Sequence, residues 1–222
     1  MSMIEVDPQQ FIIRKKRKLY KFALFANSPL CFEYDQWGKR PVDVIELGAG
    51  TGLFSVELAT RYPDQQFLAV DVKADRLQKG ALRAAELGLQ NINFVRARVE
   101  DQVKDIIEPQ SIKSIWITFP DPFPKKRAAT RRMTHPQFLK LYADLLQPGG
   151  ALYLKHDSRD FFQWSLEQLV AEQWHIDELS FDLHDSDLSD DYKIQTTYEQ
   201  RWLGEGLVTN FVKAVPHSLA LT

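Results

Sequence analysis

Short apolar runs alternate with amphipathic segments along most of the chain. Residues 41–47 are rich in β-branched side chains and run into glycines, which predicts a buried parallel strand that enters a tight turn. Apolar positions between residues 54 and 59 predict a helix that ends before Pro63, and residues 66–71 predict a second strand. The chain therefore begins its regular pattern with a strand–helix–strand unit.

The same alternation continues toward the C-terminus. It predicts helices at 74–87, 136–146 and 161–172 and strands at 92–97, 112–119, 151–155, 174–181 and 207–215. Pro148, Gly149 and Gly150 end the second of these helices. Alternating elements of these lengths predict a doubly wound α/β fold, with a mostly parallel sheet, helices on both faces and an antiparallel C-terminal strand.

Composition favours one compact domain. The chain has 222 residues, of which 44% are hydrophobic and 26% are charged. We expect an N-terminal basic arm or helix over residues 1–35 and a single domain over 36–222. Residues 1–7 lack the order of a secretory signal, and no apolar run approaches the roughly 20 residues that span a bilayer. We therefore expect a cytoplasmic protein without a membrane segment.

Cysteine and histidine are too few and too scattered to indicate a metal centre. Cys31 is the one cysteine, so an internal disulfide is excluded. The five histidines show no close metal-ligand spacing. The sequence also has no Gly-x-Ser-x-Gly turn, which argues against a hydrolase. We expect no metal site.

Charge is sorted along the chain although the net charge is only −2. Residues 14–18 are five consecutive basic residues, and residues 125–132 include five more. Residues 182–191 are acidic and would repel phosphates. A surface that binds nucleic acid would therefore use the basic clusters and avoid the acidic segment.

The glycine-rich segment at residues 46–52 lies between a predicted strand and a predicted helix, where a ligand can approach the backbone closely. Asp71 ends the second strand, where a carboxylate can accept hydrogen bonds from ribose hydroxyls. Leu53 stands where the dinucleotide fingerprint has its third glycine. Glu46 disfavours a pyrophosphate and favours a cationic amino-acid tail. These features together predict an S-adenosylmethionine (SAM) site.

A second loop follows the strand at 112–119. It presents Asp121 between prolines at the carboxyl edge of the sheet, where open α/β folds bind ligands. The prolines limit the entropy lost when a reactive geometry is held. Basic residues follow at once and are expected to neutralise phosphates that flank a target nucleotide: Lys125, Lys126, Arg127, Arg131 and Arg132.

The segment 46–52 with Asp71 resembles the first motifs of the class I, Rossmann-like methyltransferases. The segment 119–127, followed by Arg131 and Arg132, resembles the signature of bacterial tRNA (guanine-N7)-methyltransferases, and the segment 196–202 is similar to the C-terminal motif of that family. The resemblance extends from about residue 42 to 212. It implies a class I methyltransferase fold and methylation of guanine N7 in tRNA, with the variable loop as the target.

The resemblance also implies roles for single residues. Asp121 is expected at the reaction centre. The expected cofactor contacts are Glu46, Gly48, Gly50, Asp71, Arg98, Val99 and Asp121, and the expected substrate contacts are Lys125, Asp157, Thr196 and Glu199. Arg98 and Val99 align where this family commonly has Asp-Ala near the adenine, so the chain departs from the family there.

Guanine N7 carries a lone pair and no proton, so no general base is needed. Carboxylates oriented in advance would stabilise the charge that appears on the guanine ring, and Asp121, Asp157 and Glu199 are the candidates. The same groups would accept hydrogen bonds from guanine N1–H and its amine. Two alternatives remain open: an amino-group methyltransferase that acts on adenine or protein, and an RNA-binding relative without catalysis.

Overall fold

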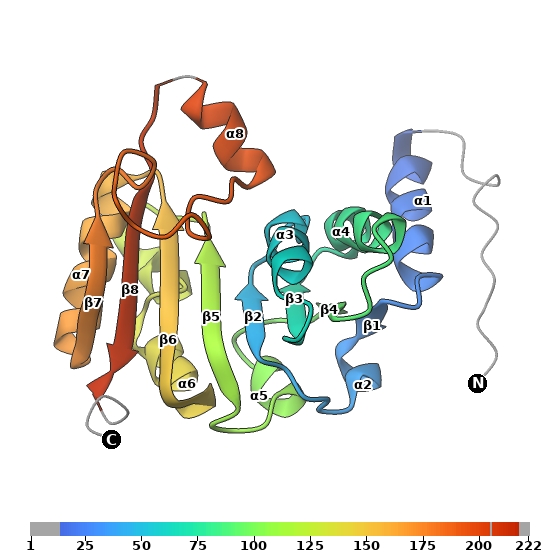
Figure 1. The fold of residues 1–222 in the computed structure, drawn as a ribbon, viewed down its shortest axis with the longest axis horizontal. Coiled ribbons are helices and arrows are strands. Elements are labelled where there is room, and N and C mark those ends of the chain that lie inside the picture. The colour runs from blue at the N-terminus through green and yellow to red at the C-terminus, as the bar shows by residue number, and fades with distance from the viewer. Residues whose placement is uncertain (1–13, 205, 218–222) are drawn as a thin grey trace.

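The computed structural model describes residues 14–204 and 206–217. Its centre is an eight-stranded sheet of order β1-β4-β3-β2-β5-β6-β8-β7 (Figure 1). Strands β1 to β6 pair in parallel, whereas β8 is antiparallel to both β6 and β7. The strands are β1 (Cys31–Glu33), β2 (Val44–Leu47), β3 (Phe67–Asp71), β4 (Ile92–Arg96), β5 (Ile112–Thr118), β6 (Leu146–His156), β7 (Trp174–Ser180) and β8 (Asn210–Pro216). The expected sheet with its antiparallel C-terminal strand is confirmed.

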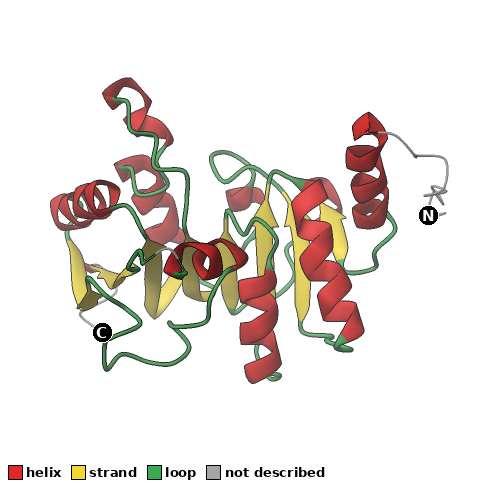
Figure 2. Cartoon of the chain, turned by 90° about the horizontal axis from the view of Figure 1, so that it is seen from above, coloured by secondary structure: helices red, strands yellow, loops and turns green. Residues whose placement is uncertain are grey.

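Helices cover both faces of the sheet, as the view from above shows (Figure 2). The described helices are α1 (Arg14–Ala26), α2 (Tyr34–Trp37), α3 (Leu53–Arg61), α4 (Ala74–Glu86), α5 (Val103–Ile106), η2 (Lys126–Arg131, a 3-10 helix), α6 (Pro136–Leu145), α7 (Arg159–Ala171) and α8 (Thr197–Leu203). Within these described elements, α1, α3 and α4 contribute to one apolar cluster, whereas α2, α5, α6 and α7 contribute to the other.

Alternate residues of the buried strands face these two clusters. In β3, Leu68 and Val70 pack in one cluster, and Phe67 and Ala69 pack in the other. All of β3 is buried. A parallel strand covered by helices on both sides needs such a continuous apolar run, which is why the predicted strands carried little alternation.

Several predicted boundaries were wrong. The strand predicted at 151–155 is β6, which begins at Leu146 and takes in Pro148 to Gly150 through an irregular stretch opposite Lys113. The helix predicted at 161–172 begins at Arg159, where Ser158 caps it. The strand predicted at 207–215 begins at Asn210. Proline and glycine therefore mark a bulge in β6, and not a gap between elements.

The N-terminal segment adds a helix and an edge strand. Residues 1–13 of the predicted basic arm lie outside the described residues. Ala23 and Phe25 in α1 are buried, α1 packs beside α4, and β1 pairs in parallel with β4. The division of the chain at residues 35 and 36 stays a prediction. Among the described residues, no helix is both long enough and apolar enough to cross a membrane.

Candidate active site

A cleft of about 250 Å³ opens at the carboxyl edge of the parallel strands. Loops after β2, β3, β4 and β5 supply its lining, because the carboxyl ends of parallel strands meet at one edge. The cleft brings together five residues that were predicted from the sequence, namely Gly48, Asp71, Val99, Asp121 and Arg131. The glycine loop and the proline-rich loop therefore border one cleft.

Asp71 ends β3 and holds the glycine loop. Its Oδ2 accepts the N–H of Gly50 at 2.9 Å, and its Oδ1 accepts the N–H of Lys73 at 2.8 Å. Burial raises the pKa of Asp71, and the two backbone donors oppose that rise. A carboxylate has about four acceptor positions, so two backbone bonds leave acceptor capacity for hydroxyls in the cleft.

The glycines of this loop have conformations and surroundings that side chains would disturb. Gly48 and Gly52 have φ angles of +71° and +69°. A Cβ at Gly52 would lie 2.7 Å from the ring of Phe94, and one at Gly48 would lie 3.2 Å from Met133 Sδ. The loop therefore approaches the strands closely, and its backbone borders the cleft without side chains in between.

Glu46 lies in β2 just below the loop and is 2% exposed. Ser55 Oγ donates to its Oε2 at 2.6 Å, and Thr118 Oγ1 donates to its Oε1 at 2.7 Å. Burial is the main cause that raises the pKa of Glu46 to about 7, while both hydroxyls oppose the rise. A cationic group nearby would therefore favour the ionised form of Glu46.

Glu46 gives the protein a specific pH dependence of stability. Because its pKa is about 7 in the folded chain and about 4.5 in the unfolded chain, the folded state binds more protons between these values. Its contribution is therefore present at low pH and is lost as pH rises through about 7. We expect Glu46→Gln to gain up to about 3 kcal/mol relative to the parent between pH 4.5 and 8, measured by urea unfolding. A pH-independent difference between Glu46→Gln and the parent would contradict this assignment.

Val99 and Arg98, the two predicted adenine contacts, have different surroundings in the structure. Val99, with Ala97 and Glu100, lines the cleft. The Arg98 side chain forms an exposed ion pair with Asp101, in which Nε and Oδ1 lie 2.9 Å apart. Ala97 and Val99 therefore give the cleft an apolar lining, and contact of Val99 or Arg98 with the cofactor stays a prediction.

Arginines brace the loop that carries Asp121. Phe123 has a φ angle of +41°, a strained conformation for a large side chain. Arg131 lies 4.4 Å from the centre of the Phe123 ring, and Arg132 donates to the Phe123 carbonyl at 3.1 Å while its guanidinium lies 4.3 Å from the Trp164 ring. Arg132 is half-buried by these contacts, whereas Arg131 stays exposed. Lys125, Lys126 and Arg127 are also exposed.

His156 is a site residue that the sequence analysis missed. It is buried at the end of β6, where its Nδ1 accepts the N–H of Ser158 at 2.8 Å. The ring proton therefore lies on Nε2, which donates to the Pro120 carbonyl at 3.0 Å. Burial lowers the pKa of His156, while the neighbouring Asp157 opposes that shift. His156 thus holds the backbone beside Asp121, and Asp157 follows it at the carboxyl edge.

The C-terminal motif reaches the same edge through α8. Tyr198 Oη donates to Asp157 Oδ2 at 3.4 Å, and its ring centre lies 5.4 Å from that of Phe119. Glu199 is 1% exposed, and its carboxylate has four hydrogen-bond partners among the described residues. Thr196 Oγ1 accepts the N–H of Glu199 at 3.0 Å. Direct contact of Thr196 and Glu199 with a substrate stays a prediction.

Solved structures share this fold. A 16S rRNA (adenine(1408)-N(1))-methyltransferase from Catenulisporales acidiphilia has a TM-score of 0.58 at 15% identity, covering 97% of this chain and 95% of that one. The 16S rRNA methyltransferase KamB has a TM-score of 0.57 at 15% identity, covering 80% and 89%. At this identity the likeness shows the fold alone, which is the expected class I, Rossmann-like methyltransferase fold.

Relatives found by sequence share more identical residues with this chain than these solved structures do. The family model described as "Putative methyltransferase" matches residues 40–210. The tRNA (guanine-N(7)-)-methyltransferase of Bacteroides thetaiotaomicron is 36% identical over 218 residues, which cover 89% of this chain and 85% of that protein. The corresponding enzyme of Brevibacillus brevis is 34% identical over 193 residues, which cover 85% and 88%. The chain therefore belongs to the tRNA (guanine-N(7)-)-methyltransferase family.

Proposed function

We propose that this protein transfers a methyl group from SAM to guanine N7 in tRNA, with the variable loop as its target. The observation that carries the proposal is that the glycine-rich loop and Asp121 border one cleft. Asp121 is exposed, and exposed basic residues follow it at 125–127. The curated relatives carry the same activity in their names. We further propose that it acts in the cytoplasm without a metal, and that residues 1–35 form a basic arm on a domain at 36–222.

The residues at the glycine loop fit SAM as the cofactor. Asp71 has acceptor capacity for ribose hydroxyls, Val99 and Ala97 supply apolar surface for a base, and Glu46 is a buried carboxylate beside the backbone of Gly48. The cofactor supplies a methyl group on a sulfonium sulfur. In this proposal Gly48 and Gly50 let the cofactor approach the backbone, and Glu46 balances the positive charge of its amino-acid tail.

The acceptor would enter from the side of Asp121. Guanine N7 attacks with its own lone pair, so the task of the enzyme is to orient N7 toward the methyl group. Asp121 and Asp157 are carboxylates at the same edge, and they stabilise positive charge on the methylated ring. We propose that Lys125 and Thr196 help to hold the target nucleotide there.

Incubation with labelled SAM and an unmodified tRNA transcript, followed by mapping of the modified base, tests the proposal. The expected product is 7-methylguanine at one position in the variable loop. Methylation of an adenine amine or of protein would support the alternative amino-group methyltransferase. Cofactor binding without any methylated product would contradict catalysis on tRNA.

The exposed cations after Asp121 are expected to bind phosphates. Replacing Lys126 and Arg127 together with alanine removes two charges, so the slope of log affinity for tRNA against log salt concentration should become shallower by about 2. Affinity should fall about tenfold near 0.1 M salt. Fluorescence anisotropy over a salt series measures both quantities. An unchanged slope would exclude these two side chains from the RNA surface.

A further inference from the structure

Buried polar residues cross the sheet just beneath the cleft. Glu46 in β2 accepts a hydrogen bond from Thr118 in β5, and Thr118 is the register partner of Lys155 in β6. Lys155 Nζ then donates to Glu199 Oε2 in α8 at 2.8 Å. These four polar residues therefore extend from β2, below the glycine loop, to α8, the helix of the C-terminal motif.

Lys155 is a fully buried cation. Its side chain is 0% exposed, and Nζ also donates to the carbonyl of Ile194 at 2.8 Å. The rings of Phe54 and Phe119 lie 5.6 and 5.9 Å from Nζ. A charge in such surroundings is costly unless a counter-charge and hydrogen bonds compensate it. The buried charge of Lys155 therefore depends on Glu199 as its counter-charge.

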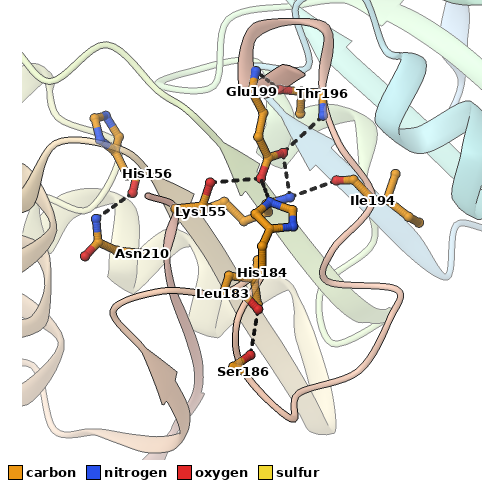
Figure 3. A network of polar contacts seen from close by, with 10 residues as sticks. Lys155, His156, Leu183, His184, Ser186, Ile194, Thr196, Glu199 and Asn210 are labelled. Carbon is orange, nitrogen blue, oxygen red and sulfur yellow. Dashed lines mark hydrogen bonds and ion pairs between the residues drawn. The ribbon is translucent and has the colours of Figure 1, made fainter. Parts of the chain in front are cut away.

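The Glu199 carboxylate is likewise surrounded by hydrogen-bond partners (Figure 3). Its Oε2 accepts from Lys155 Nζ and from the N–H of Thr196 at 3.1 Å, and its Oε1 lies 2.8 Å from His184 Nε2 and 3.0 Å from Thr209 Oγ1. These four bonds use the acceptor positions of a carboxylate. A guanine could bind Glu199 only if one of them broke.

The carboxylate that binds Lys155 also belongs to the cap of α8. The Thr196 hydroxyl accepts the N–H of Glu199, and the Thr196 N–H donates back to the Glu199 carboxylate, so the two residues form a capping box. One residue before Glu199, Tyr198 contacts both Asp157 and Phe119 at the cleft side of the sheet. A shift of Glu199 would therefore move these contacts.

The geometry points to Lys155 and Glu199 as positioning residues: their buried ion pair locks α8 onto β6 and sets Tyr198 against Phe119 and Asp157 on the acceptor side of the cleft. Glu199 acts through Lys155 and does not touch the guanine. The inference rests on the proposed function, because the acceptor side is defined by tRNA methylation. Loss of one partner leaves a buried charge unpaired, whereas loss of both leaves none.

A double-mutant cycle with Lys155→Met and Glu199→Gln tests this role. Each single variant should lower kcat at saturating tRNA at least tenfold, with the Kd for SAM within twofold of the parent, and the double variant should recover most of the loss. If Glu199 bound the guanine, the double variant would be at least as slow as Glu199→Gln, and that result would overturn the inference. Exposed Glu167→Gln in α7 is the matched control.

Amide hydrogen exchange over residues 197–203 tests the lock without any turnover. Exchange should be faster in each single variant and restored in the double variant, whether or not the protein methylates tRNA. Unchanged exchange in both single variants would overturn the inference and leave the proposed function intact. Should a single variant fail to fold, Thr209→Val removes one donor at nearly constant shape. Thr209→Val should lower kcat several-fold, and an unchanged kcat would contradict the proposed role of Lys155 and Glu199 in positioning α8.

Discussion

Asp121→Ala should lower kcat for tRNA methylation about 10³-fold, while the affinities for SAM and for tRNA change much less. Asp121 lines the cleft on a loop that three prolines, Arg131 and Arg132 restrain. Positive charge leaves the sulfur and appears on guanine during the transfer, so a carboxylate held in place stabilises the transition state more than the ground state. Single-turnover kinetics with labelled SAM measure the step directly.

Two further variants separate charge from shape at this position. Asp121→Asn keeps the size of the side chain and should still lose about a hundredfold in kcat, because the missing charge matters most. Asp160→Ala removes an exposed aspartate in the first turn of α7 and should leave kcat unchanged. Full turnover by a folded Asp121→Asn that binds both ligands would exclude Asp121 from catalysis.

The central strands and helices of this fold were predictable because their pattern is local. β2 and β3 are buried along their whole length, and both are mostly apolar runs that stop at glycine or aspartate. β5 is buried from Ile115 to Thr118 and leads to Pro120. Such runs mark buried parallel strands. β1 has three residues, too few for any periodicity, and it becomes a strand because β4 offers it a free edge. The helix α8 was also missed, although Thr196 and Glu199 carry the local signature of a capping box, because seven residues give too short an apolar pattern to mark a helix.

The cleft was predictable to the extent that loops after successive strands must meet at one edge. Asp71 and Asp121 follow from that rule. His156 and Met133 do not, because their roles depend on which backbone packs against them. Lys155 did leave a signal that the sequence analysis overlooked: a lysine inside an apolar strand must have a buried partner.

Asp71→Asn should weaken SAM binding about a hundredfold, or about 2.7 kcal/mol. The carboxylate accepts the N–H groups of Gly50 and Lys73 with its two oxygens, and an asparagine can offer only one oxygen to them. The amide NH₂ would then face a backbone donor, so the glycine loop would have to move. Isothermal calorimetry with SAM measures the loss.

The control for this variant is Asp75→Asn, in the first turn of α4, which should bind SAM as the parent does. Because the loop itself shifts, Asp71→Asn should also speed amide exchange at Gly50, and that change needs no ligand. Undiminished SAM affinity together with faster exchange would mean that the cofactor does not depend on this loop geometry. Undiminished affinity with unchanged exchange would show that Asp71 neither holds the loop nor binds the cofactor.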